Sequence, residues 1–281
     1  MQRERVTNNT YVFTSSLYAQ VTAGAVITEE GAVLIDTLMY PDETLQIKQF
    51  VEERLGKRIR WIVNTHFHAD HTVGTCLFPN AQIISHKLCR QLLDQRGRES
   101  LELARVNSPE LRNVKVVLPQ IIFDTELTLY LGGKTLQLWS TPGHSMDSIV
   151  CSVKEDQVLF AGDTLIPIPY FIDGDYNALV NTLQELKTHR FENIVQGHGE
   201  VILRGEVCDK IESDINYLVQ LREKVDDALT STSPQTKLNS IDIEDCGKSR
   251  ILLNGMVQQL HRQNVNWLAE ERRETLRVKH P

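Results

Sequence analysis

The sequence lacks the marks of a disulfide scaffold, a secreted protein or a membrane protein. Its 281 residues include only five cysteines, an odd number, with no Cys-x-x-Cys pair. We therefore expect reduced thiols, and neither a disulfide framework nor a zinc knuckle. The first ten residues carry charge with no apolar stretch behind them, and no apolar run is long enough to span a bilayer. These absences predict a cytoplasmic protein without membrane contact.

An excess of basic residues is also missing. Lys and Arg number 30 against 37 Asp and Glu, which gives a formal net charge of −7. Nucleic-acid binding needs clustered cations that neutralise phosphates, so no nucleic-acid partner is expected. Hydrophobic residues make up 41% of the chain, which is enough for an ordinary globular core. The expected partner is a small-molecule substrate, and a homodimer is left open.

Short β-branched and apolar runs dominate the chain up to about residue 205. They are interrupted by helical patterns over residues 41–58, 86–111 and 178–188. The Gly132-Gly133 pair is typical of a hairpin turn. The predicted strands are 11–14, 19–28, 32–36, 61–63, 81–85, 114–118, 126–131, 135–139, 149–153, 157–161 and 193–195.

Helical spacing takes over after about residue 205. Residues 207–229 and 249–279 predict two helices, and the Thr- and Ser-rich stretch 230–240 between them predicts a loop. We therefore expect two domains, a β-rich one over 1–205 and a helical C-terminal extension over 206–281.

The strongest chemical signal is Thr65-His66-Phe67-His68-Ala69-Asp70-His71, directly after an apolar strand. Residues two apart in an extended segment point the same way, so His66 and His68 can hold one ion together. A turn then offers Asp70 and His71 to a second ion. Imidazole and carboxylate are ligands that zinc takes in catalytic sites. A solvent-facing polar loop is the competing interpretation, and the ligand types found downstream disfavour it.

Three later segments each end a predicted strand with a glycine next to a His or an Asp. They are Pro142-Gly143-His144, Ala161-Gly162-Asp163 and Gln196-Gly197-His198. Glycine allows the tight turns and close approach that a metal ligand needs. Each segment alone could be an ordinary loop, but all four motifs in this order are specific. Over about residues 10–205 the chain resembles the metallo-β-lactamase superfamily, whose hallmark is His-x-His-x-Asp-His after a strand.

This resemblance implies a fold and a metal site. The fold class is α+β, an αβ/βα four-layer sandwich, with residues 1–205 as the catalytic domain. The cofactors would be two divalent metal ions, Zn²⁺ first, with Fe or Mn as alternatives. The seven implied ligands are His66, His68, Asp70, His71, His144, Asp163 and His198.

The resemblance also implies roles for individual residues. His66, His68 and His144 would bind the first ion. The remaining ligands would bind the second, with Asp163 as the bridge between the two. Asp36, which closes the predicted strand 32–36, matches a position that supports the metal loop from behind. A plain strand-ending Asp is the competing interpretation of that residue.

The implied function is that of a metallo-hydrolase that cleaves a small ester, thioester or lactone. Two ions about 3.5–4 Å apart can share a hydroxide that attacks the electrophilic centre. Asp70 is the candidate catalytic residue, because it could take the proton as the tetrahedral species collapses. Tyr170 is a weaker candidate for substrate binding, since lactonases of this fold often use a tyrosine beyond the bridging Asp. A core or rim tyrosine is the alternative.

Other functions on the same fold stay open. A mononuclear iron enzyme similar to the persulfide dioxygenases would use two His and one Asp. Phosphodiester cleavage, β-lactam hydrolysis and a silent binding protein are further alternatives. Asp163 stands where cysteine-containing β-lactamases carry a Cys, which lowers β-lactams as the native substrate. Glyoxalase II carries the same seven ligands, but its cationic thiol-binding signature is not evident in residues 207–281.

The remaining histidines and the last helix complete these expectations. His86, His189, His261 and His280 have no partner at ligand spacing, so surface or helix positions are expected. In the helical extension, Met256, Leu260 and Trp267 share one apolar side. We expect that side to form a wall of the substrate pocket, although such faces are more often core.

Overall fold

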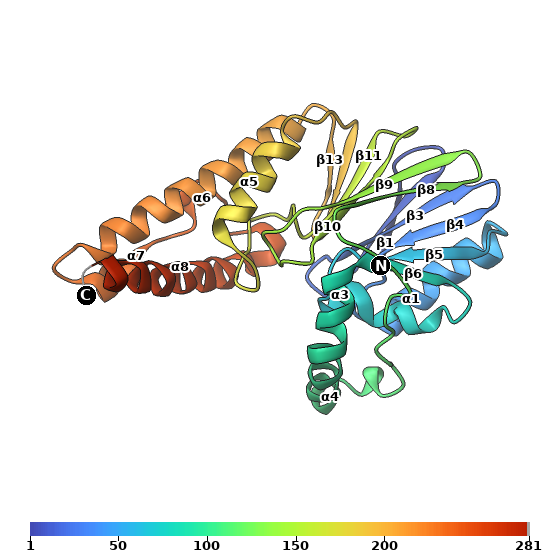
Figure 1. The fold of residues 1–281 in the computed structure, drawn as a ribbon, viewed down its shortest axis with the longest axis horizontal. Helices are drawn as coiled ribbons and strands as arrows, with labels where there is room; N and C mark the ends of the chain where they lie inside the picture. Colours follow the sequence, from blue (N-terminus) through green and yellow to red (C-terminus); the bar gives the residue numbers. More distant parts are fainter. Residues whose placement is uncertain (280–281) are drawn as a thin grey trace.

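The computed structural model describes residues 1–279 and has the predicted four-layer architecture, with two sheets face to face and helices outside them (Figure 1). The first sheet has the order β1-β2-β3-β4-β5-β6-β7, and the second has the order β13-β12-β11-β10-β9-β8. Neighbours pair antiparallel except β4 with β5, β5 with β6, β6 with β7, and β11 with β12, which are parallel. The α+β sandwich expected from the sequence is therefore confirmed.

The strands of the first sheet are β1 Gln2–Arg5, β2 Thr10–Thr14, β3 Thr22–Thr28, β4 Gly31–Ile35, β5 Ile59–Val63, β6 Gln82–His86 and β7 Ile121–Phe123. Those of the second are β8 Glu126–Leu131, β9 Lys134–Ser140, β10 Ile149–Val153, β11 Val158–Gly162, β12 Asn193–Gln196 and β13 Val201–Leu203. The α-helices are α1 Pro41–Lys48, α2 Ala69–Thr72, α3 Lys87–Leu92, α4 Arg98–Asn107, α5 Tyr176–Leu186, α6 Val207–Leu229, α7 Pro234–Ser240 and α8 Val257–Lys279. Shorter turns of 3-10 or π-helix span Gln49–Arg54, Val73–Leu77, Leu93–Gly97, Pro109–Leu111, Glu244–Cys246 and Leu252–Gly255.

Alternate side chains of a single strand pack into two different apolar cores. In β4, Val33 and Ile35 belong to the apolar cluster between the sheets. Their neighbours Ala32 and Leu34 join the cluster that includes Ile47 of α1. Side chains alternate faces along a strand, and here both faces are buried. This explains why the strand reads as a continuous apolar run and not as alternating apolar and polar residues.

Helices α5, α6 and α8 cover the outer face of the second sheet. Leu159 and Ile194 of that sheet share one apolar cluster with Leu218 of α6 and with Val257 and Leu268 of α8. Beyond the sheet, α6 and α8 run side by side, with α7 between their ends (Figure 1). The extension therefore shares a core with the sheet, and a domain boundary at residue 205 stays a prediction. Among the described residues, no helix has the length and apolar character to cross a membrane.

One expected strand is absent. Residues 114–118 form no strand; the next strand is β7, which begins at Ile121. Val114 and Val116 pack instead with Leu101 and Leu111 in a small cluster below α4. The apolar alternation of this segment therefore reflects contact with a helix, because burial on one side gives the same pattern as a sheet face.

The helical extension differs from expectation at two points. The stretch 230–240 contains α7, which begins at Pro234, where the fixed φ of proline favours the first helical turn. The last helix begins at Val257 and not near residue 249, because Leu253 and Asn254 have φ values of 47° and 56°. Left-handed backbone at two consecutive residues interrupts a right-handed helix.

The two sheets come very close at Gly24 of β3. A Cβ atom added there would lie 2.0 Å from Cε1 of Phe160, on the inner face of the second sheet. We predict that Gly24→Ala lowers the free energy of unfolding by about 1–3 kcal/mol, because the ring must move within a packed core. Gly205→Ala is the matched control, since nothing lies within 4 Å of an added Cβ there. Denaturant unfolding of both variants tests this, and equal stabilities would contradict it.

Candidate metal centre

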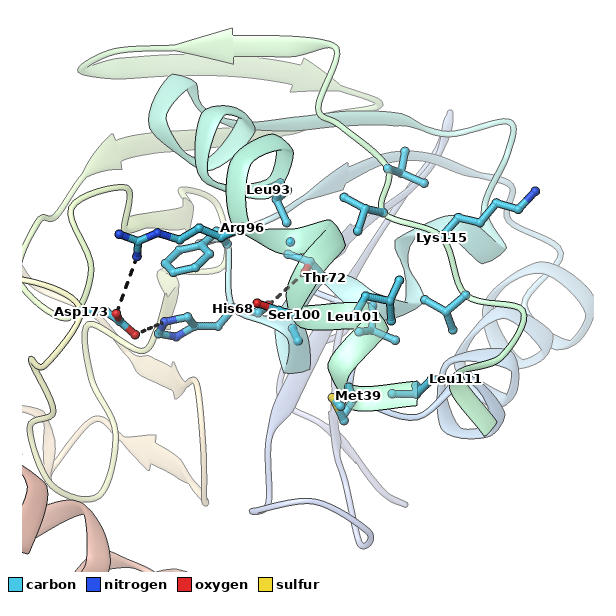
Figure 2. A pocket seen from close by; sticks show the side chains of 18 residues that line it. Met39, His68, Thr72, Leu93, Arg96, Ser100, Leu101, Leu111, Lys115 and Asp173 are labelled. Atoms are coloured by element: carbon cyan, nitrogen blue, oxygen red, sulfur yellow. Dashed lines mark hydrogen bonds and ion pairs between the residues drawn. The ribbon is translucent and has the colours of Figure 1, made fainter. Parts of the chain in front are cut away.

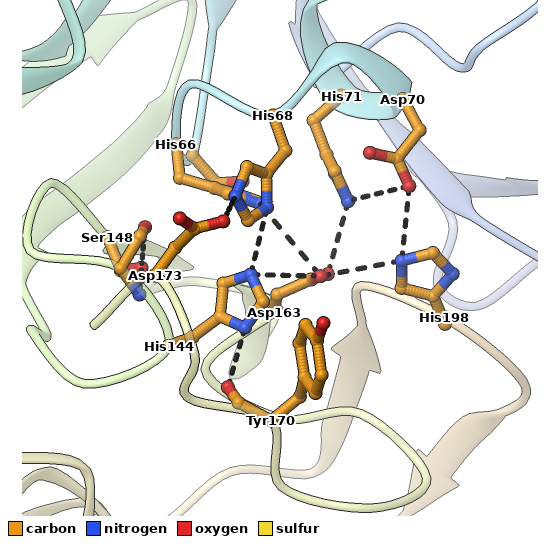
Figure 3. Close-up of polar contacts among 12 residues, drawn as sticks. His66, His68, Asp70, His71, His144, Ser148, Asp163, Tyr170, Asp173 and His198 are labelled. Atoms are coloured by element: carbon orange, nitrogen blue, oxygen red, sulfur yellow. Dashed lines mark hydrogen bonds and ion pairs between the residues drawn. The ribbon is translucent and has the colours of Figure 1, made fainter. Parts of the chain in front are cut away.

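The candidate ligands gather at the edge where strands of both sheets end. His66 lies just beyond β5 of the first sheet. His144, Asp163 and His198 follow β9, β11 and β12 of the second. Asp70 and its neighbour His71 come from the short helix α2, which faces these loops (Figure 3). Residues up to 132 positions apart in the sequence, from 66 to 198, thus meet in one cluster.

Backbone hydrogen bonds tie the two sheets together at this edge. The Thr22 amide donates to the Gly197 carbonyl at 2.8 Å, and the Ile149 amide donates to the Thr65 carbonyl at 2.9 Å. Thr65 precedes the first candidate ligand, and Gly197 precedes the last. The loops that carry the ligands are therefore fixed to one another by main-chain contacts as well as by the side chains.

Four side chains form a first set of possible ligands. His68 Nδ1 lies 3.0 Å from His66 Nε2 and 3.1 Å from His144 Nε2. The carboxylate of Asp163 completes the set, with Oδ2 3.4 Å from His144 Nε2. One donor atom from each of the four lies within 4.8 Å of the others. This is the spacing of atoms around a single ion.

A second set forms beside the first. His198 Nε2 lies 3.3 Å from Asp70 Oδ2, and His71 Nε2 lies 3.8 Å from the same oxygen. Asp163 stands between the sets: its Oδ1 is 3.1 Å from His71 Nε2, and its Oδ2 is 3.4 Å from both His144 and His198. The carboxylate of Asp163 is thus in reach of both positions, as a bridging ligand must be.

The other ring nitrogen of each histidine is held by an oxygen atom. These pairs are His66 Nδ1 with Thr65 Oγ1 at 3.0 Å, His68 Nε2 with Asp173 Oδ2 at 3.1 Å, His71 Nδ1 with Asp36 Oδ2 at 2.9 Å, His144 Nδ1 with the Tyr170 carbonyl at 2.8 Å, and His198 Nδ1 with the Ala19 carbonyl at 2.9 Å. Carbonyl and carboxylate oxygens only accept hydrogen bonds, so they fix the proton on the outer nitrogen. A neutral ring held in this way presents its remaining lone pair to the centre.

Electrostatics separate the histidines into two kinds. Burial lowers the pKa of His144 to about 4 and that of His66 well below its usual value, which keeps both rings neutral. Burial also favours the neutral ring at His71 and His198, but the combined effect of the Asp163 and Asp70 carboxylates, with Asp36 added at His71, outweighs it. These carboxylates raise the pKa of His71 well above its usual value and that of His198 to about 10. At these two rings a cation competes with a proton, so metal binding there releases protons.

The donor set fits divalent metal ions. His71 Nε2 and Asp163 Oδ1 are both buried without a hydrogen-bond partner, because their contact is short but not aligned as a hydrogen bond. Buried polar atoms left in this way are costly unless a charge compensates them. Imidazole nitrogens and carboxylate oxygens are the ligands that zinc, iron and manganese accept. Two cations facing Asp163 would satisfy all of these atoms together.

Asp36 links the first motif to the strand behind it. It follows β4 with a φ of 57° and is buried. One of its oxygens accepts the Thr65 amide at 2.8 Å, and the other accepts the Thr65 hydroxyl at 2.7 Å and faces His71 Nδ1. Because the Thr65 hydroxyl donates its proton to Asp36, a lone pair of the Thr65 oxygen can accept a hydrogen bond from His66 Nδ1. A single carboxylate thereby orients two candidate ligands.

We predict that Asp36→Asn lowers metal affinity by about 10–100-fold, the usual effect of changing a residue that orients a metal ligand. Competition with a chromogenic chelator measures the affinity. Asp124→Asn is the control, because Asp124 is exposed and pairs with Lys87 away from the centre. An unchanged affinity in Asp36→Asn would reject the supporting role.

The backbone carbonyl of Tyr170 contacts one of the candidate metal ligands. This carbonyl accepts from His144, while the Tyr170 hydroxyl donates to Gln263 Oε1 of α8 at 2.9 Å. Asn264, next along α8, donates to the Pro169 carbonyl at 2.7 Å. The last helix therefore holds the loop that orients His144. The Tyr170 ring also lies 5.9 Å from the His144 ring, and a part for Tyr170 in substrate binding stays a prediction.

Sequence reasoning missed two residues beside the centre. Asp173 faces His68, and Tyr18 stands near Asp70 with its pKa raised to about 12 by burial and by that carboxylate. Neither residue lies in a motif or a periodic pattern. Asp173 is 105 positions from His68, so only the folded chain could reveal the contact.

The expected pocket wall in the last helix is only partly present. Met256 lines a groove that also includes Tyr18, on the side of the centre where His198 lies. Trp267 instead packs edge-on against Phe171 in the core. Leu260 packs against the same core. The apolar face of α8 is thus mainly a core face.

The other histidines have structural contacts among the described residues. His86 caps α3 by accepting the Leu88 amide at 3.2 Å. His189 stacks between aromatic rings, and His261 is buried in contact with the Tyr217 hydroxyl at 3.0 Å. His261 lies in helix α8, as expected, whereas the expectation of a surface or helix position missed the buried place of His86 at the end of β6. His280 lies outside the described residues.

Comparison with known proteins places this geometry in a family. Residues 18–204 match the family described as the metallo-beta-lactamase superfamily. Over 195 residues the chain is 28% identical to the acyl-coenzyme A thioesterase MBLAC2 of Homo sapiens, covering 60% of this chain and 69% of the relative. Over 170 residues it is 24% identical to the beta-lactamase-like protein 2 homolog of Caenorhabditis elegans, covering 60% of this chain. The match spans about half, 52%, of that relative's length.

The fold likeness extends to solved structures. A metallo-beta-lactamase from Pontibacter korlensis superimposes with a TM-score of 0.62 at 19% identity, covering 75% of this chain and 98% of that one. At this identity the likeness shows the shared fold.

Proposed function

This chain belongs to the metallo-beta-lactamase superfamily, and we propose that it is a metal-dependent hydrolase that cleaves a small thioester, ester or lactone with two divalent ions, zinc first among them. The observation that carries this proposal is the pair of ligand sets that share the Asp163 carboxylate. The human relative bears the name of a thioesterase, which supports an activated acyl substrate. Metal content separates this proposal from the mononuclear iron alternative, which uses only two His and one Asp.

The candidate ligands would have different roles, according to their positions. Two bound ions would supply Lewis acidity and a water acidic enough to attack at neutral pH. His66, His68 and His144 would hold one ion, and the oxygen atoms behind these rings keep them from turning away. Asp163, with a side chain 6% exposed, would hold the two ions at a fixed separation.

Asp70 is suited to moving a proton. Its side chain is 16% exposed, against 6% for Asp163, so it can exchange protons with solvent. Its Oδ2 lies 3.3 Å from His198 Nε2, which keeps the carboxylate at the centre. It could accept a proton from the attacking water and pass it to the leaving group as the tetrahedral species collapses.

We predict that the purified protein contains about two metal ions per chain and that a chelator abolishes its hydrolytic activity, because two-ion sites polarise substrate and activate water together. Elemental analysis gives the stoichiometry. A panel of thioesters, esters, lactones, phosphodiesters and β-lactams gives the substrate class, before chelation and after Zn²⁺ is restored. One iron per chain together with oxygen uptake on a persulfide would overturn the proposal in favour of the dioxygenase alternative.

We predict that Asp163→Ala loses far more activity than Tyr170→Phe. Removing Asp163 disturbs both ligand sets and lowers the metal content. The Tyr170 hydroxyl is already bonded to Gln263, so its loss falls well below the ~10²–10³-fold effect of a lost oxyanion donor. Steady-state kinetics and metal analysis on both variants provide the test. Small and equal losses would contradict the bridging role of Asp163.

A further inference from the structure

An apolar cavity of 320 Å³ lies beside the candidate metal centre, on the side of His68 (Figure 2). Its lining comes mostly from the chain that joins β6 to β7, which contains α3, α4 and the segment after α4. The main apolar lining residues are Met39, Phe67, Leu93, Leu101, Leu111 and Val116. The volume falls at the lower end of the range of small-molecule sites, about 300–1,000 Å³.

The cavity and the metal motif share one stretch of chain. Phe67 to Ala69, Thr72 and Val73 line the cavity, and these residues include the candidate ligand His68 and directly flank Asp70 and His71. A molecule in the cavity therefore lies beside the ring that would hold a metal ion.

A polar pair marks the end of the cavity nearest the metal centre. Asp173 Oδ2 lies 3.1 Å from His68 Nε2, and its Oδ1 lies 3.9 Å from Arg96 Nη1 (Figure 2). Lys115 stands at the opposite side of the cavity and extends away from it (Figure 2). Between these charged ends the wall is mainly aliphatic and aromatic, with Thr72 and Ser100 as its polar side chains. A ligand that fits must therefore be apolar along its length, with its polar part at the His68 end.

The other side of the metal centre has a different character. The groove near His198 is more polar: Ser15, Tyr18, Gln20, Asn254 and Gln259 line it, together with apolar residues such as Leu203 and Met256. A substrate that spans the metal centre would meet an apolar cavity in one direction and polar side chains in the other. A scissile carbonyl between the two would place its alkyl chain in the cavity and its polar leaving group in the groove.

We propose that the cavity lined by α4 and the segments on either side of it binds the aliphatic acyl chain of the substrate, so that the enzyme hydrolyses medium-chain acyl thioesters, from hexanoyl to decanoyl, in preference to acetyl thioesters. The inference rests on the proposed hydrolase function and adds to it the part of the substrate that sets selectivity. A sugar or nucleotide in this cavity would bury hydroxyl or phosphate groups without partners, which is costly. A saturated chain leaves no polar group unpaired.

The first test is a chain-length series. Acetyl, butyryl, hexanoyl and octanoyl thioesters of coenzyme A, which share one leaving group, are hydrolysed by the zinc-loaded enzyme with thiol release as the readout. Burial of each added methylene is expected to raise kcat/KM about fourfold, equivalent to about 0.8 kcal/mol, until the cavity is filled. A flat series would overturn the inference.

Variants in α4 test whether the cavity causes the dependence on acyl-chain length. Ala104 lines the cavity, whereas Leu103, its neighbour, has a side chain 67% exposed. Ala104→Phe is expected to lower the octanoyl-to-acetyl ratio of kcat/KM more than tenfold, while the control Leu103→Phe keeps the wild-type ratio. Leu101→Ala enlarges the cavity and moves the preferred chain to a longer one, which provides the test if Ala104→Phe does not fold. Unchanged ratios in folded cavity variants would reject the acyl-chain site.

A binding measurement separates this inference from the proposed function. Octanoate is titrated calorimetrically into the zinc-loaded wild type, Ala104→Phe and Leu103→Phe. Binding that is lost only in Ala104→Phe supports the cavity even if no thioester is cleaved, and in that case the hydrolase proposal fails by itself. Thioester hydrolysis with no dependence on chain length, and with no octanoate binding, overturns the cavity and leaves the hydrolase standing.

Discussion

The buried carboxylate of Asp163 is the constraint on which the centre depends. It is almost inaccessible to solvent, and the charges of His198 and His71 hold its pKa well below the usual value even though burial opposes this. A buried anion is tolerated only when positive charge and donors surround it. The polypeptide leaves no spare room there, since a Cβ at Gly197 would lie 1.9 Å from Asp163 Oδ1. Histidines from both sheets therefore converge on one point.

Convergence alone would not make a precise site, because an imidazole on a loop can rotate. Here each ring is fixed from behind by an oxygen acceptor, and these acceptors come from four separate parts of the chain. Asp36 follows β4, Thr65 follows β5, Ala19 precedes β3, and Tyr170 and Asp173 lie in the loop before α5. The loop is in turn held by Asn264 of α8. The C-terminal helix thus acts on the centre through main-chain geometry, without presenting a ligand of its own.

The sequence predicted the parts of this protein that are encoded locally. The motif 65–71 and the glycine-flanked residues at strand ends were recognisable because each lies in a short, specific pattern. The apolar runs predicted most of the strands, and the layered fold followed from the family resemblance that these motifs carry. The assignment of individual ligands to ions and the division at residue 205 remain predictions. For long-range contacts outside these motifs the sequence carried no signal, as with Asp173 and its partner His68.

Errors of secondary structure also have local physical causes. The run 19–28 was predicted as one strand, but Ala19 and Gln20 adopt left-handed φ values of 45° and 50°, and β3 begins at Thr22. That unusual turn aims the Ala19 carbonyl at His198. Backbone strain of this kind costs of order 1–3 kcal/mol per residue and persists only where other contacts impose it. Propensity rules fail at such a place because the conformation serves the centre.

The segment between β6 and β7 can vary without a change in the sheet that carries the metal motif. The two strands are parallel neighbours, paired from Ile84 with Ile121 to His86 with Phe123, so the chain leaves the sheet and returns to it at adjacent positions. The residues between β6 and β7 form a connection whose length is not set by the sheet. The entropic cost of closing such a connection grows only slowly with its length. Its helices can be shortened, extended or exchanged while the strands beside the metal motif keep their register. Reactivity and the choice of substrate can therefore diverge independently in descendants of this chain.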